Sequence, residues 1–198
     1  MSAVAANTAS LASDTDQPDK ERTMSSVTTE LSELPTVTKT RWRIDPARSS
    51  IEFRTPTLWG LATVKGRFDR YDGTLDLDQD PAIELTIDAG SLDTKNKLRD
   101  KHLRSEDFFD VEHSPEVRFV SDSATIDGQR LKVRGHLYAA GSSMPLELEA
   151  GLGRVGDELE VVSSTHVDHR ELGMTHSTLG MIRTPSELIV RGRLVRDG

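Results

Sequence analysis

From about residue 41 onward, apolar and polar side chains alternate along the chain with a period of two. The clearest segment is residues 83–88, where isoleucine, leucine and isoleucine alternate with glutamate, threonine and aspartate. Successive side chains of a β-strand point to opposite faces, so this alternation predicts strands with one buried face. The same pattern predicts further strands at residues 40–44, 50–54, 63–68, 74–77, 116–121, 131–139, 146–152, 160–167 and 188–194.

Turn signals separate these segments. They are Asp72-Gly73, Asp80-Pro81, Asp127-Gly128, Gly141-Ser142 and residues 153–157. Aspartate, glycine and proline supply the positive or fixed φ angles that hairpin turns require. Eight or more short antiparallel strands at nearly regular spacing indicate an all-β sandwich or barrel rather than an α/β fold.

Small residues at predicted inward positions favour the barrel. They are Gly135, Ala139, Ala150 and Gly192. Small side chains leave room inside a barrel or permit the tight bends of its strands. The alternative, that the glycines mark β-bulges, stays open at this point.

One polar segment, residues 94–110, breaks the period of two and predicts a short helix that begins at an Asp or Thr cap. At roughly 100° per residue, one face of this helix carries Leu98, Arg99, His102 and Leu103, and this face is expected to lie toward the barrel. The other face carries Lys97, Asp100, Lys101 and Arg104. Polar groups on a buried face need a partner, either in the protein or in a ligand.

Composition and charge exclude several classes of function and partner. Residues 1–40 contain no aromatic residue and no apolar period, and we expect a disordered arm ahead of a domain at 41–198. The net charge of −8 argues against a nucleic-acid partner. The absence of cysteine excludes disulfides and thiolate metal sites. The sequence shows no secretory leader and no membrane span, so we expect a soluble cytoplasmic protein without stable membrane insertion; a homodimer stays open.

Three segments together resemble the YceI family. Residues 99–119 read RDKHLRSEDFFDVEHSPEVRF and are similar to the hallmark segment of that family. WRIDPARSSIEF at 42–53 resembles its opening strand pair, and VKGRF at 64–68 with YDGTL at 71–75 resembles its second hairpin. The chain departs from the family pattern at Arg48, where a histidine is usual, at Ala140-Gly141, where His-Gly is usual, and in lacking a signal peptide.

The resemblance implies a lipocalin-like, eight-stranded antiparallel β-barrel with the helical insert near its opening. It also implies an elongated apolar cavity that binds a polyisoprenoid chain or an isoprenoid quinone. We expect no cofactor. The residues expected to contact this ligand are Phe53, Leu85, Ile87, Arg99, His102, Phe108, Phe119, Val133, Leu137 and Leu148. The favoured alternative for Arg99 and Asp100 is that they hold the insert on the barrel, and for Phe108 and Phe109 that they seal a core.

Catalytic and metal sites are not supported by the residue pattern. His166 and Asp168 would share one strand face and His169 the other, so these side chains do not converge on a metal ion. No nucleophile motif such as Gly-x-Ser-x-Gly appears. The leading hypothesis is therefore a non-catalytic carrier or store of an isoprenoid lipid. The alternatives are a lipocalin-like enzyme that acts on a small hydrophobic substrate at the barrel mouth, and an interaction module whose core is filled by its own side chains.

Overall fold

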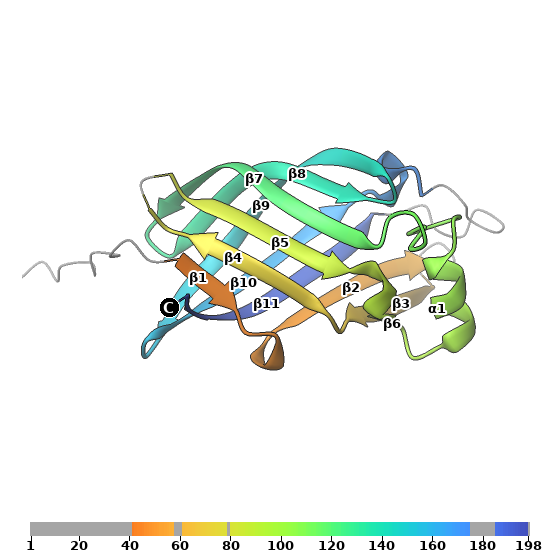
Figure 1. The fold of residues 1–198 in the computed structure, drawn as a ribbon, viewed down its shortest axis with the longest axis horizontal. Coiled ribbons are helices and arrows are strands. Elements are labelled where there is room, and N and C mark those ends of the chain that lie inside the picture. The colour runs from red at the N-terminus through yellow and green to blue at the C-terminus, as the bar shows by residue number, and fades with distance from the viewer. Residues whose placement is uncertain (1–40, 58–60, 79, 175–184, 198) are drawn as a thin grey trace, which may run out of the picture. The chain divides into compact units, whose positions relative to one another are not determined.

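The structure, a computed structural model, describes residues 41–57, 61–78, 80–174 and 185–197. Within these residues, eight antiparallel strands close into a barrel, which confirms the expected fold (Figure 1). Their order around the barrel is β1 (Arg41–Ile44), β4 (Tyr71–Asp76), β5 (Ala82–Asp88), β7 (Glu116–Asp127), β8 (Arg130–Ala139), β9 (Ser142–Val155), β10 (Glu158–Val167) and β11 (Ser186–Arg196), which returns to β1.

The long strand β11 changes partner along its length. Its last residues pair with β1, where Leu194 lies opposite Ile44, and its first residues pair with β2 (Ser50–Thr57), where Glu187 lies opposite Arg54. Strand β2 then pairs with β3 (Ala62–Phe68), which pairs with the short β6 (Leu92–Asp93). The β2–β3 hairpin therefore extends the wall beyond the ring at one end of the barrel. The helix α1 (Lys97–Arg104) lies at this same end (Figure 1).

Within the described ranges, three short 3-10 turns connect these elements. They are η1 (Pro46–Arg48), η3 (Ala89–Ser91) and η4 (His169–Leu172). None of the described helices is long and apolar enough to span a membrane.

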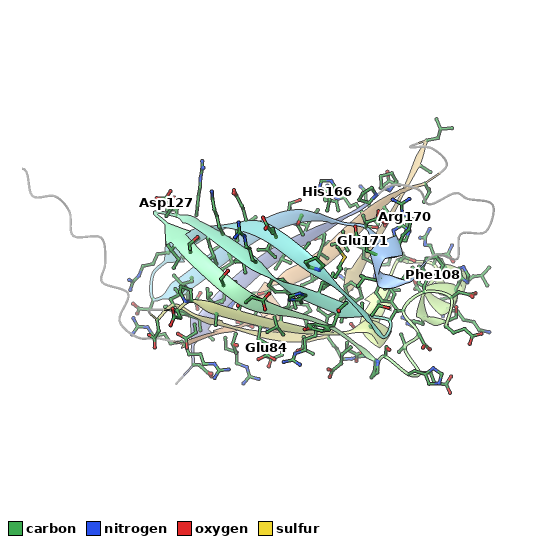
Figure 2. The ribbon with its side chains drawn as sticks, turned by 90° about the horizontal axis from the view of Figure 1, so that it is seen from above. Glu84, Phe108, Asp127, His166, Arg170 and Glu171 are labelled. Atoms are coloured by element: carbon green, nitrogen blue, oxygen red, sulfur yellow. The ribbon has the colours of Figure 1, made fainter. Side chains whose placement is uncertain are left out.

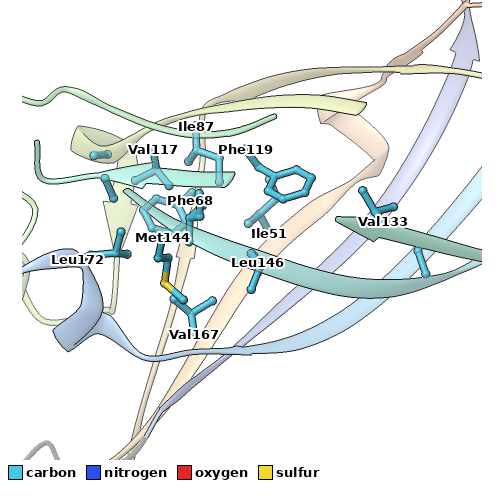
Figure 3. Close-up of a cluster of buried hydrophobic side chains, with 14 of the residues drawn as sticks. Ile51, Phe68, Ile87, Val117, Phe119, Val133, Met144, Leu146, Val167 and Leu172 are labelled. Carbon is cyan, nitrogen blue, oxygen red and sulfur yellow. The ribbon is translucent and has the colours of Figure 1, made fainter. Parts of the chain in front are cut away.

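Most of the buried apolar side chains of the barrel form one continuous cluster. Figure 3 shows Leu172 at one end of this cluster and Val133 toward the other. Away from α1 the interior is occupied by large buried side chains that do not line the cavity described below, and we call this the closed end. Its residues are Trp42, Ile44, Leu75, Leu131 and Leu194.

An ionic cluster holds η1 to the outside of the closed end. The guanidinium of Arg48 donates two hydrogen bonds to the carboxylate of Glu158, at 2.9 and 2.7 Å, and a third to Asp45 at 2.6 Å. These bonds lower the pKa of both carboxyl groups. The arginine that departs from the family pattern is thus a structural tie between η1 and the β9–β10 hairpin.

Two local predictions were wrong. Asp72-Gly73 is not a turn but lies inside β4, where Gly73 pairs with Leu85 and Asp72 accepts hydrogen bonds from Arg43. The helix of the insert spans only Lys97–Arg104, and its cap is Asn96, whose side chain accepts from the backbone N–H groups of Leu98 and Arg99. Asparagine satisfies the free donors of a first helical turn as well as Asp or Thr does.

The small inward residues serve two purposes. Gly135 faces a register shift between Ser121 and Ser123 of β7, so the bulge interpretation holds at this position. Ala139 and Ala150, in contrast, line an interior cavity. Both of the alternatives drawn from the sequence therefore apply, each to different residues.

Candidate functional site

The half of the barrel that carries α1 contains a cavity of about 490 Å³. This volume lies within the ~300–1,000 Å³ typical of ligand sites. Alternate residues of β10 line it from Val161 to Val167, so it runs roughly 20 Å along this strand at about 3.3 Å per residue. The lining includes His102, whose side chain is exposed, so the cavity reaches the surface beside α1. We call this opening the mouth.

Most of the cavity wall is apolar. Strands β5, β7, β8 and β9 contribute only hydrocarbon or aromatic side chains to it, namely Ile83, Leu85, Ile87, Val117, Phe119, Leu137, Ala139, Leu146, Leu148 and Ala150. Such a surface offers an apolar ligand the same dry environment as a protein core.

A narrow band of hydroxyl groups interrupts the apolar wall on β2, β10 and β11. It consists of Thr55, Thr57, Ser163, Thr165 and Ser186. Thr55 and Ser186 share a hydrogen bond of 2.7 Å, and Ser163 donates to the carbonyl of Glu149 at 2.8 Å. These three groups are therefore already paired within the wall.

Aromatic contacts join the insert to the barrel at the mouth. The ring of Phe109 packs edge-on against Phe68 at 5.9 Å between centroids, and Phe68 contacts Phe53 at 5.8 Å. The ring of Phe108 contacts His102 at 5.1 Å. Phe108 and Phe109 both line the cavity and also pack in the apolar cluster. The two roles that the sequence left open for these rings, cavity wall and core seal, are therefore compatible.

Polar contacts fix the helix to β6 and to the residue that follows this strand. The buried carboxylate of Asp100 accepts from the backbone N–H of Thr94 at 2.9 Å and from the Thr94 hydroxyl. Arg99 donates to the hydroxyl and the carbonyl oxygen of Thr94, at 2.8 and 2.9 Å, and Arg104 donates to the carbonyl of Leu92. Arg99 and Asp100 therefore both bind Thr94, which lies between β6 and α1, and hold the start of the helix in place.

The predicted orientation of the helix was partly wrong, although Arg99, His102 and Leu103 of the predicted inward face do line the cavity. Leu98 was placed toward the barrel and Asp100 away from it, but Leu98 is 80% exposed and Asp100 only 6%. The bond of Asp100 to Thr94, just after β6, and that of Arg104 to Leu92 of β6 set the rotation of α1 and leave Leu98 exposed. Hydrophobic periodicity alone does not report such polar anchors.

Nine of the ten predicted ligand contacts lie around one cavity. They are Phe53, Leu85, Ile87, Arg99, His102, Phe108, Phe119, Leu137 and Leu148. Val133 is buried but is not part of the lining. That these side chains contact a ligand stays a prediction.

Several lining residues were not anticipated. The period of two along β10 would have placed Ser163 and Thr165 inside, but hydroxyl residues were not sought there. His169, Leu172 and Met174 follow the end of β10 in and after η4, where no strand period exists to indicate their direction.

The segment that contains Asp168 and His169 forms the 3-10 turn η4. Asp168 caps η4, and hydrogen bonds from Arg170 lower the pKa of Asp168 to about 2. His169 lines the cavity, and burial lowers the pKa of its imidazole. His176, the third histidine considered for a metal site along with His166 and His169, lies outside the described residues. The described part of the chain contains no group of three or more metal-ligating side chains.

The lowered pKa of His169 predicts a pH dependence of stability. Unfolded histidine titrates near 6.5, so below this pH the unfolded chain binds a proton that the folded chain does not. We expect the folded state to lose stability as pH falls from about 7.5 to 5.5, and His169→Gln to lose less over the same range. Urea midpoints at both pH values measure this; equal losses in the two proteins would contradict it.

Comparison with known sequences agrees with this geometry. The sequence model of the YceI-like domain family matches residues 42–192. The YceI protein of Escherichia coli O157:H7 is 38% identical over 112 residues, which cover 54% of this chain and 58% of that protein. The YceI protein of Salmonella arizonae is 37% identical over the same shares. The match thus spans little more than half the length of these relatives.

Solved structures share the barrel. Burkholderia cenocepacia BcnA has a TM-score of 0.69 at 16% identity, covering 76% of this chain and 98% of its own. The YceI protein of Campylobacter jejuni has a TM-score of 0.62 at 24% identity, covering 70% and 87%. A polyisoprenoid-binding domain from Saccharophagus degradans, implicated in plant cell wall breakdown, has a TM-score of 0.67 at 15% identity, covering 80% and 99%. At these identities the likeness establishes the fold.

Proposed function

The chain belongs to the YceI-like family, and we propose that it binds a long apolar isoprenoid lipid inside the barrel and carries or stores it without catalysis. The observation that carries this proposal is the apolar cavity, which is deep, closed at one end and open beside α1. A prenyl chain has the elongated shape and the hydrocarbon surface that such a cavity fits.

The distribution of polar groups supports a ligand with one polar end. Arg99 and His102 lie at the mouth, where the lining reaches the surface, whereas the walls from β5, β7, β8 and β9 are apolar throughout. An apolar chain is stabilised by removal from water, and a polar head needs only a few donors near solvent. This arrangement suits a quinone or a pyrophosphate head at the mouth with the chain inside.

The comparisons support the same ligand class. One solved structure with this fold is described as a polyisoprenoid-binding domain. A cavity of about 490 Å³ also argues against a core filled by the protein's own side chains. No arrangement of the described residues favours a particular reaction, so the proposal includes no catalysis.

Analysis of the purified protein tests the proposal. The full chain is purified from its native host without detergent and extracted with organic solvent, and the extract is examined by mass spectrometry. We expect a prenyl lipid in an amount comparable to that of the protein. A barrel that is consistently empty, and that takes up no prenyl lipid in vitro, would refute the proposal.

The His102→Ala variant separates carrier from enzyme. The imidazole of His102 lies at the exposed edge of the cavity, so removing it should leave retention of the apolar chain nearly unchanged. A chemical conversion of the bound molecule that wild-type protein performs and this variant does not would favour the enzyme.

A further inference from the structure

Two leucines at the mouth end are far more exposed than the other large apolar side chains of the described residues. Leu61 is 87% exposed and Leu98 is 80% exposed. The next most exposed are Val155 at 47% and Tyr138 and Val162 at 44% each. Leu61 directly precedes β3 at the β2–β3 turn, and Leu98 lies on α1, both at the same end of the barrel (Figure 1). Neither leucine contributes to the core.

Cationic side chains flank Leu98 on the outer face of α1. Lys97 precedes it, and Lys101 follows one turn later on the same exposed face. Within the described residues neither lysine has an ion-pair partner, whereas Lys95 pairs with Asp93. The one acidic residue of the helix, Asp100, is buried against Thr94. In a chain with a net charge of −8, this face is locally cationic.

This surface adjoins the mouth of the cavity. His102 follows Lys101 on α1, and its side chain is both exposed and part of the cavity lining. Figure 2 shows Phe108 and Arg170 at this end of the barrel and Asp127 at the opposite end. Exposed Glu106 and Glu112 occupy the loop after the helix, so the cationic area is confined to α1 itself.

We propose that Leu61, Leu98, Lys97 and Lys101 form a docking surface for an anionic lipid bilayer. Apolar side chains that enter the interface and lysines that face acidic head groups are the two contributions that hold peripheral proteins on such a surface. Docking in this orientation places the mouth against the bilayer, so a prenyl chain passes between membrane and cavity without crossing water. The role in transfer rests on the proposed function; the docking itself does not.

Vesicle sedimentation with the full chain tests the surface. Vesicles are made of phosphatidylcholine alone or of equal parts phosphatidylcholine and phosphatidylglycerol, each at low and at high salt. We expect binding to the anionic vesicles at low salt, little binding to the neutral ones, and a loss of binding as salt screens the charges. The double variant Lys97→Glu/Lys101→Glu and the single variant Leu98→Glu should each bind at least about tenfold more weakly.

Val155→Glu is the matched control. Val155 is the next most exposed aliphatic side chain and lies on the β9–β10 hairpin, beside the closed end. The control should bind vesicles like the wild type, and circular dichroism should show all variants folded. Absence of binding to anionic vesicles, equal binding to neutral vesicles, or unchanged binding of both mouth variants overturns the proposal. So does a Leu98→Glu variant that changes the oligomeric state of the free protein, since a second copy would then cover this surface.

Ligand content of the same samples keeps the two proposals apart. If the docking surface is wrong, the barrel still contains a prenyl lipid but the mouth variants sediment as the wild type does. If the proposed function is wrong, the barrel is empty while the vesicle binding of the wild type and its variants still differs.

Discussion

The Thr165→Trp substitution is expected to leave the barrel folded and deprive it of its apolar ligand. Thr165 points into the cavity from β10, opposite Leu188 on β11. An indole ring there fills space that the ligand would occupy, and tryptophan is itself well suited to a strand. Overlap between this ring and the ligand should cost about 1–3 kcal/mol, as overpacking of a protein interior does, so ligand retention should fall roughly 5- to 150-fold. Mass spectrometry of the extracted protein measures the remaining lipid.

The His166→Trp substitution provides the control on the same strand. His166 is the next residue along β10 and lies on the outer surface, where Figure 2 labels it. The same ring at this position should leave the amount of bound lipid unchanged. Equal lipid in both variants and in the wild type would contradict the placement of the ligand in this cavity, provided that both variants retain the wild-type circular dichroism spectrum.

The strands were predictable because their signal is local. Alternation such as that of residues 83–88 depends only on neighbours in the sequence, and it located the ends of the eight barrel strands to within four residues. The exception is β7, which continues past its register shift to Asp127, six residues beyond the predicted end. What the alternation does not contain is the identity of the partner strand. The division of β11 between β1 and β2 depends on contacts between segments well over a hundred residues apart.

Asp72-Gly73 illustrates a local signal that a distant contact overrides. The pair has the composition of a hairpin turn, but Arg43 of β1 binds Asp72, and Gly73 lies against Leu85 of β5. A Cβ added to Gly73 by substitution would stand 3.0 Å from the Leu85 side chain and 3.1 Å from the carbonyl oxygen of Glu84. The glycine is therefore explained by close packing between strands, which no turn statistic reports.

The candidate site was predictable in its apolar part. Phe119 and Leu137 face inward by alternation, and both line the cavity as well as the core. The mouth was less predictable, because η4 and α1 have no strand period and their directions depend on single polar contacts. Asp100 is the clearest case, since it was expected on the outer face of the helix but is buried and bonded to Thr94.

The Gly135→Ala substitution is expected to destabilise the barrel strongly. An added Cβ would stand 2.2 Å from the carbonyl oxygen of Val120 and 2.8 Å from the Cα of Ser121. Both atoms belong to the backbone of β7 at its register shift, so neither can move aside as a side-chain end would. Overpacking against backbone costs about 2–3 kcal/mol, which lowers Tm by roughly 5–10 °C in a domain of this size.

The Gly151→Ala substitution isolates this steric cause from the general effect of replacing a strand glycine. Gly151 lies in β9, and the nearest atom to an added Cβ is the carbonyl oxygen of Val162 at 3.8 Å, an ordinary contact distance. Here the substitution mainly restricts the unfolded chain, so stability should stay unchanged or rise by about 0.4–1 kcal/mol. Thermal unfolding of both variants measures the contrast. Similar Tm values for the two would mean that the bulge opposite Gly135 relaxes freely, and that the close approach of β7 and β8 does not require a glycine.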